Sequence, residues 1–151
     1  MNLRRTGGPC TTLLALVAVV TCSCTSRPTV PNVIDADAPQ EFTTTESGLK
    51  YRILRKSDGP KPTASDRVRV DYSGWLDNGT VFDSSYERRE STEFALSGVI
   101  AAWTEGMQLI GEGGMIELEV PSELGYGERG NPPNIPPNST LHFKVELLRI
   151  E

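Results

Sequence analysis

The residues of this chain that could do chemistry are aromatic and apolar side chains that stand beside turns. They occur between residues 68 and 147 in four ordered stretches: VRVDYSGWLDNGTVFDSS, FALSGVIAAWTEG, PSELGYG and IPPNSTLHFKVEL. The sequence shows no nucleophile–base pair, no metal-ligand cluster and no phosphate-binding loop. We therefore expect a pocket that binds an apolar group and needs neither a metal nor a cofactor.

Taken singly, the candidate residues also have structural explanations. Trp103, Phe82 and Phe143 could simply fill the core, and Asp83 could cap a turn through its carboxylate. Tyr126 stands between two glycines, which would let the backbone bring its ring close to a neighbouring group. The joint order of these residues, rather than any one of them, indicates a binding site.

His142 is the only histidine, and it alternates with apolar residues on the polar face of a predicted strand. No cysteine, serine or paired carboxylate stands at a recognisable catalytic spacing from it, so we expect no catalytic role. The charged run at residues 87–92 is interpreted as a solvated loop.

Short strands are the elements predicted to position most of these residues. Apolar and polar residues alternate at residues 49–53, 67–72, 116–120 and 141–147. This period of two is typical of a sheet with one buried and one solvated face. The DNG tripeptide at residues 77–79 is a strong turn signal.

Residues 100–110 depart from this alternation. Ile100, Trp103 and Met107 recur at spacings of three and four, which predicts a short amphipathic helix that is interrupted or ends near Gly106. A sheet of four or more strands with one short helix must bury that helix against its apolar face. The sequence therefore predicts an α+β fold in which a curved antiparallel sheet, a half-barrel, wraps around one short helix.

Residues 1–23 are interpreted as an export signal. Arg4 and Arg5 precede a short apolar run, LLALVAVV, and then small residues and cysteines. The run is shorter than the ~20 residues that a membrane-spanning helix needs. The cysteines resemble those of a bacterial lipobox, with Cys24 as the expected lipidated residue and Cys22 as the alternative. Ordinary cleavage and release is the other interpretation.

Residues 24–43 are rich in proline, threonine and aspartate and are interpreted as a linker or tether before a folded domain at residues 44–151. That domain contains no cysteine, so it forms no intramolecular disulfide. The chain has 151 residues, a net charge of -5 and a pI of about 5.0, without a basic block. We therefore expect no nucleic-acid partner.

The motifs VxVxYxGxL, FDSS, VIxxWxEG, YG and IPPNxTLxFxVEL follow one another with compatible spacing. This pattern strongly resembles the FKBP family of peptidyl-prolyl cis-trans isomerases over residues 44–151. The segment SGLKYRILRKSDGPKPTASD is similar to the exported bacterial lipoprotein branch. The resemblance implies a half-barrel around a short helix, with a pocket between the two.

The resemblance also implies an isomerase that rotates X–Pro bonds and assists protein folding in the cell envelope. Such an enzyme would face the periplasm and be held to a membrane by its lipid. The alternative is an FKBP-like module that binds peptides or partner proteins without turnover. Proline-containing polypeptides are the expected partners. A monomer is expected, because residues 25–43 are too short and proline-rich for the helical dimerisation region of some relatives.

Site residues are assigned by the same resemblance. Trp103 would be the floor under the proline ring, and Tyr126 would direct its hydroxyl at the carbonyl that precedes the proline. Asp83 would be an orienting and electrostatic group beside Phe82, and Ile100 would offer its backbone N–H. The residues expected to bind substrate are Tyr72, Phe94, Val99, Ile100, Ile135 and Phe143.

Three departures from the family pattern concern the pocket wall. Thr92 stands where many relatives have an aromatic residue, the link from Leu96 to Val99 is short, and Ala102 replaces a common glycine. They affect the expected substrate preference, and the expected affinity for macrolide inhibitors such as tacrolimus and rapamycin, more than the fold.

Overall fold

The computed structural model describes residues 33–151. Both candidate lipidation sites, Cys22 and Cys24, lie outside the described residues, as do the predicted export signal and residues 24–32. In chain order the elements are β1 (Thr43–Thr44), β2 (Lys50–Arg55), β3 (Arg67–Leu76), β4 (Val81–Ser84), α1 (Ser85–Arg88), β5 (Thr92–Ala95), α2 (Ala101–Met107), β6 (Met115–Val120) and β7 (Leu141–Ile150). Single 3₁₀ turns occur at Leu96–Gly98, Ser122–Leu124 and Gly127–Arg129.

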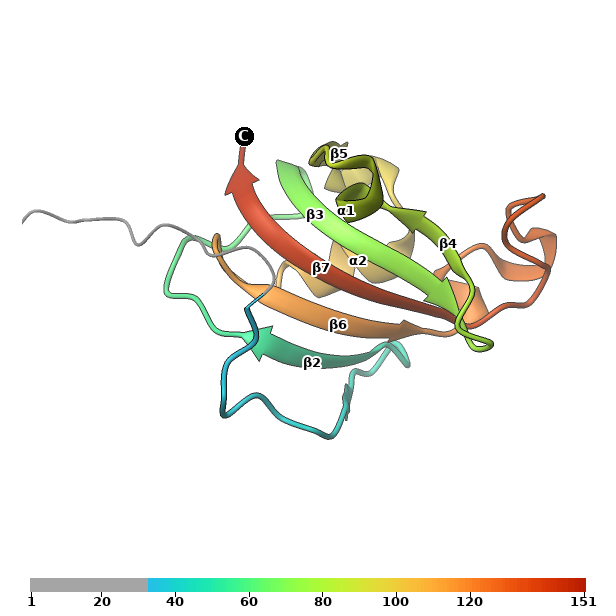
Figure 1. Ribbon diagram of the computed structural model, residues 1–151, viewed down its shortest axis with the longest axis horizontal. Coiled ribbons are helices and arrows are strands. Elements are labelled where there is room, and N and C mark those ends of the chain that lie inside the picture. The colour runs from blue at the N-terminus through green and yellow to red at the C-terminus, as the bar shows by residue number, and fades with distance from the viewer. Residues whose placement is uncertain (1–32) are drawn as a thin grey trace, which may run out of the picture.

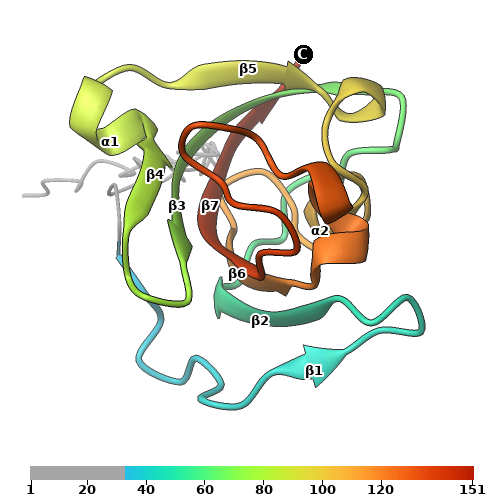
Figure 2. The same ribbon diagram turned by 90° about the vertical axis from the view of Figure 1, so that its right-hand side faces the viewer.

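The strands form one antiparallel sheet in the order β1-β2-β6-β7-β3-β4. The long strand β3 pairs with β7 on one side. On its other side it pairs with β5 through residues 67–70 and with β4 through residues 73–75. The sheet bends around α2, as Figure 1 and Figure 2 show. The predicted α+β half-barrel is confirmed.

The core lies between α2 and the inner face of the sheet. Along β3, buried residues alternate with more exposed ones, and Leu118 and Val145 on β6 and β7 are fully buried. Gly106 allows α2 to approach the sheet, since a Cβ there would lie 2.9 Å from a methyl carbon of Leu118. Burying the apolar stripe of α2 stabilises a helix too short to be stable alone.

The helix predicted at residues 100–110 is α2, which spans Ala101–Met107 and ends just after Gly106. The interpretation of residues 87–92 as a loop was partly wrong. Arg88 ends the one-turn helix α1, and Thr92 begins β5, which pairs with β3. Within residues 33–151, no helix is long and apolar enough to cross a membrane.

Residues 33–42 lie against β2, although they were predicted as part of the linker. Asp35 donates its backbone N–H to the Leu54 carbonyl at 2.8 Å and accepts from the Lys56 N–H at 2.7 Å. Arg55 donates to the Val33 carbonyl at 3.2 Å. The guanidinium of Arg52 on β2 lies 5.0 Å from the centre of the Phe42 ring. These contacts cover the part of β2 that β1 does not pair with, where backbone groups would otherwise be exposed.

Candidate active site

A cavity of about 670 Å³ opens between α2 and the inner face of the sheet. This volume is within the usual range of ligand pockets. The lining residues are Tyr72, Phe82, Asp83, Phe94, Gly98, Val99, Ile100, Trp103, Tyr126, Asn131, Asn134, Ile135 and Phe143. All ten residues assigned from the sequence lie around this cavity, while their individual roles stay predictions. Gly98, Asn131 and Asn134 were not assigned.

Trp103 forms the aromatic floor of the cavity and is only 4% exposed. Its ring stands nearly perpendicular to those of Tyr72, Phe94 and Phe143, with centroid separations of 5.2, 5.3 and 5.5 Å. Such edge-to-face contacts are favourable for aromatic quadrupoles. No described residue hydrogen-bonds to the buried Trp103 Nε1. Packing alone therefore fixes the indole within the described part of the chain.

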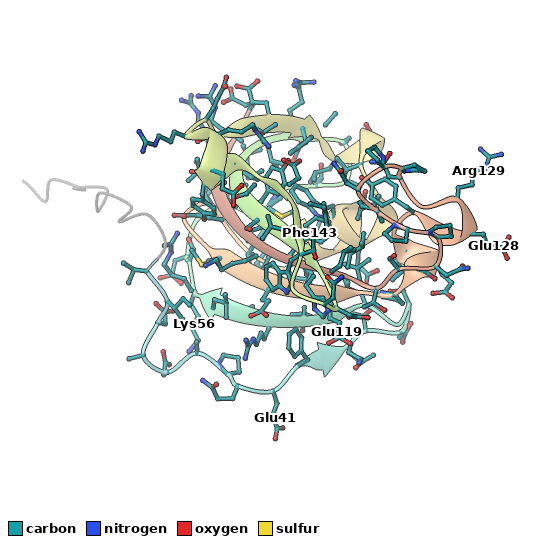
Figure 3. All side chains as sticks on the ribbon, turned by 45° about the vertical axis from the view of Figure 1, so that its right-hand side comes forward. Glu41, Lys56, Glu119, Glu128, Arg129 and Phe143 are labelled. Carbon is teal, nitrogen blue, oxygen red and sulfur yellow. The ribbon has the colours of Figure 1, made fainter. Side chains whose placement is uncertain are left out.

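Gly74 on β3 makes room for the aromatic wall. A Cβ at this position would lie 2.6 Å from a carbon of the Phe82 ring and 2.8 Å from one of the Phe143 ring. Those two rings meet edge to face at 5.5 Å. Phe143 is buried and is labelled near the middle of the molecule in Figure 3. The glycine in the first motif therefore has a direct steric reason.

Asp83 holds a polar network at the rim of the cavity. It accepts hydrogen bonds from the Tyr72 hydroxyl on one carboxylate oxygen and from Arg88 on the other. Arg88 also lies 3.3 Å from the Tyr72 hydroxyl oxygen and 3.2 Å from that of Thr92. Burial, and then the bond to Asp83, raise the pKa of Tyr72 to about 12. Tyr72 therefore stays a protonated donor near neutral pH, and both Asp83 oxygens are occupied.

The FDSS motif explains how Asp83 is placed. Ser84, directly after Asp83, accepts the Glu87 N–H at 3.4 Å and caps α1. Ser85 is fully buried, accepts the Tyr72 N–H at 2.9 Å and donates to Asp71 at 2.9 Å. Ser85 ties the start of α1 to β3, and Ser84 caps that helix. This fixes the backbone of Asp83 and starts the one-turn helix that carries Arg88 to the rim.

Arg88 is another contributor to the site that sequence reasoning missed. Its position five residues after Asp83 gives no period of a strand or a long helix. The serine cap after the aspartate was the available signal, because a capped turn brings a residue several positions later back toward the start. Because residues 87–92 form a charged run, they were interpreted as a solvated loop instead.

The start of α2 forms a second wall. Ile100 precedes the helix with φ -59° and ψ 149°, and its carbonyl accepts the Trp103 N–H at 2.9 Å. Thr104 donates its hydroxyl to the Leu96 carbonyl at 2.6 Å, which ties the short link before Val99 to the helix. The shortened link is therefore a defined turn.

The third wall is the loop that carries Tyr126, a side chain that is 38% exposed. Ile135, at the far end of the loop, is buried in the core cluster and anchors it. No group within residues 33–151 forms a hydrogen bond with the Tyr126 hydroxyl, which leaves it available at the cavity mouth.

His142 lies on the outer face of the sheet and does not line the cavity. Its Nε2 is 2.7 Å from an Asp77 oxygen, and its ring stacks on Trp75 with centroids 5.8 Å apart. Residues 33–151 contain no group of histidine, cysteine and carboxylate side chains suited to a metal ion. The cavity lining supplies aromatic and apolar surface together with hydrogen-bonding groups.

Comparison with known proteins supports this description. A family model described as FKBP-type peptidyl-prolyl cis-trans isomerase matches residues 59–148. The FKBP-type 22 kDa peptidyl-prolyl cis-trans isomerase of Escherichia coli K12 is 53% identical over 106 residues, 70% of this chain and 52% of that protein. Peptidyl-prolyl cis-trans isomerase Mip of Coxiella burnetii is 44% identical over 72% of this chain and 47% of that protein.

Among solved structures, FkpA from Escherichia coli superposes with a TM-score of 0.72 and 47% sequence identity, over 75% of this chain and 53% of that chain. This protein therefore spans about half the length of these relatives. The match includes the strands, the helix and the loop that surround the cavity. The chain belongs to the family of FKBP-type peptidyl-prolyl cis-trans isomerases.

Proposed function

We propose that this protein is a peptidyl-prolyl cis-trans isomerase that rotates X–Pro bonds of polypeptides held in the cavity. The observation that carries the proposal is the aromatic floor, in which Trp103 is enclosed by three perpendicular rings. A proline ring is apolar and compact, so it can cover this floor and displace water from it. The hydrogen-bonding groups of Tyr126 and Ile100 then face the peptide backbone.

The reaction needs no bond cleavage, which agrees with a site built from aromatic rings. Rotation about an X–Pro bond takes tens to hundreds of seconds unaided, and a barrier of ~18–20 kcal/mol arises from amide resonance. Removing water from the amide favours the twisted state, because that state has less charge separation than the planar one. A fixed cavity can also bind the twisted geometry more tightly than either planar isomer.

Each proposed role follows from an atom's surroundings. Trp103 supports the proline ring, and the free hydroxyl of Tyr126 donates to the carbonyl before the proline. Asp83 acts by orienting Tyr72, because its two oxygens already accept hydrogen bonds. A tenfold rate increase needs only about 1.4 kcal/mol, so a few such contacts are of the right order.

A protease-coupled assay with a Leu-Pro tetrapeptide tests the proposal, using the two tryptophans as a matched pair. Trp103→Phe shrinks the floor and is expected to lower kcat/KM severalfold while the fold is kept. Trp75→Phe changes a ring on the outer face, which stacks on His142, and should leave kcat/KM unchanged. Equal effects of the two substitutions on kcat/KM would remove the aromatic floor from the mechanism.

The alternative is a binding module without turnover. The observation that favours it is the rim, where Arg88 bridges Asp83 and Thr92 and closes one wall with polar groups. Peptide-induced NMR shifts at the cavity residues without any acceleration of isomerisation would support this reading. Acceleration would reject it.

We further propose that the protein is exported and is held at the membrane of the cell envelope through a lipid on Cys24. The export signal and the lipobox-like cysteines support this proposal, with Cys22 as the alternative. Mass spectrometry of the N-terminal peptide, with Cys24→Ala and Cys22→Ala variants, identifies the modified residue.

Macrolides such as tacrolimus and rapamycin are expected to compete with peptides for the cavity, and inhibition of the coupled assay measures this competition.

A further inference from the structure

The Tyr126 loop places two asparagines, Asn131 and Asn134, in the lining of the cavity on a fixed backbone. Asn131 and Ile135 exchange backbone hydrogen bonds of 2.8 and 3.0 Å, and the Asn138 N–H donates to the Gly127 carbonyl at 2.8 Å. A Cβ at Gly130 would lie 2.4 Å from the Ile135 carbonyl oxygen, so the turn is close-packed. Figure 2 shows this loop crossing in front of α2 at the open side of the sheet.

The side chains of this loop divide into two sets. Asn131 and Asn134 line the cavity together with Tyr126, and their amides form no hydrogen bond with any group in residues 33–151. Glu128 and Arg129 point away from the body of the molecule, as Figure 3 shows. The loop therefore has neutral polar residues in the cavity lining and its charged side chains in solvent.

We propose that Asn131 and Asn134 determine substrate specificity by hydrogen-bonding a neutral polar side chain, such as glutamine, on the residue that precedes the proline. The inference rests on the proposed isomerase function and names its preferred substrates. Each asparagine amide both donates and accepts, so the pair can satisfy a glutamine amide in either orientation.

The position of the preferred residue follows from the loop. Tyr126, at the start of the loop, is the proposed donor to the carbonyl before the proline. We place the side chain of the residue that carries this carbonyl on the same side of the cavity as the asparagines. A leucine there leaves both amides without a partner from the substrate. Because the asparagines are exposed, a substrate with leucine at this position loses only the net contribution of one or two ordinary hydrogen bonds to its binding.

The test compares two peptides that differ only in the residue before proline, Ala-Gln-Pro-Phe and Ala-Leu-Pro-Phe. The measured quantity is the ratio of their kcat/KM values. Asn131→Leu and Asn134→Leu remove an amide at similar size, and neither position has a positive φ that would strain leucine. We expect the Gln/Leu ratio to fall about two- to tenfold in these variants. Glu128→Gln, on the outward side of the same loop, should leave the ratio unchanged.

An unchanged ratio in both asparagine variants overturns the inference, including when both rates fall together, because that result indicates a structural role. If the wild-type protein accelerates neither peptide, the isomerase proposal fails separately. The same ratio is then measured from the peptide affinities by NMR titration. Loss of a Gln-Pro preference in the asparagine variants would keep the specificity role, and no preference would reject it.

Discussion

At the scale of single residues, the cavity depends on how Asp83 and Tyr72 hold each other. Tyr72 is 5% exposed, so its hydroxyl needs a partner inside the protein. Asp83 provides that partner, and Arg88 balances its charge. These contacts agree with the proposed role of the carboxylate as an orienting group rather than a proton donor.

Asp83→Ala is expected to lower kcat/KM about tenfold while the protein stays folded. The substitution leaves the buried Tyr72 hydroxyl without its acceptor, at a cost of about 1–3 kcal/mol in unfolding free energy. Urea unfolding and the coupled assay measure the two effects. Asp77→Ala is the control, since Asp77 contacts His142 on the outer face. Complete unfolding of Asp83→Ala would move its role from the site to the fold.

The raised pKa of Tyr72 predicts that the free energy of unfolding falls at alkaline pH. Its pKa rises from 10.0 to about 12 through burial and the bond to Asp83. Because the folded pKa lies above the unfolded one, the stabilisation is complete below pH 10 and is lost as the pH rises toward 12. Urea titrations between pH 9 and 11.5 should show this decline, and Tyr72→Phe should reduce its slope. An identical slope in the variant would contradict the account.

At the scale of elements, the aromatic wall of the cavity forms where β3 pairs with β4 on one side and with β7 on the other. Gly74 on β3 faces Phe82 of β4 and Phe143 of β7. The rings occupy the space that any side chain at position 74 would need. Strand pairing and cavity shape are thus set at the same place.

Gly74→Ala is expected to destabilise the protein by about 1–3 kcal/mol and to lower kcat/KM, because rigid rings must shift to accept the methyl group. Gly98→Ala is the matched comparison for stability, since a Cβ there meets nothing within 4 Å. Urea unfolding of both variants gives the difference. Equal stability of the two would show that the rings move freely.

The sequence predicted the elements whose side chains repeat with a regular period. Alternation located the strands around Tyr72 and Phe143, and the three–four spacing located the helix of Trp103. Local periodicity does not report contacts between distant segments. For this reason the contacts of Arg88 with Asp83 and Thr92, and the place of Asn131 and Asn134 in the cavity lining, were not predicted. The docking of residues 33–42 on β2 was also hidden by their irregular, proline-containing sequence.

At the scale of the whole molecule, a buried ion pair joins the sheet to the N-terminal residues. Glu146 on β7 is fully buried and accepts from Arg55 on β2, which also donates to the Gly113 carbonyl at 2.7 Å and to the Val33 carbonyl. Tyr86 of α1 lies 3.4 Å from the other Glu146 oxygen. The network connects α1, β7, β2 and the first described residues behind the sheet.

Glu146→Gln is expected to lower the free energy of unfolding by about 3–5 kcal/mol, because it removes the carboxylate that compensates the Arg55 charge. Asp37→Asn breaks the exposed ion pair between Asp37 and Lys56, whose side chains are 73% and 66% exposed respectively. This substitution should not measurably change the free energy of unfolding. Urea unfolding compares them. Similar stabilities for both variants would show that the buried network contributes little.

The most direct test of the central claim is NMR exchange between the cis and trans forms of a Leu-Pro peptide at equilibrium. It observes the isomerisation itself, without a coupling protease. We expect the protein to increase the exchange rate strongly and Tyr126→Phe to reduce the increase while the fold is unchanged. A well-folded protein that binds the peptide in the cavity and leaves the exchange rate unchanged would contradict the account.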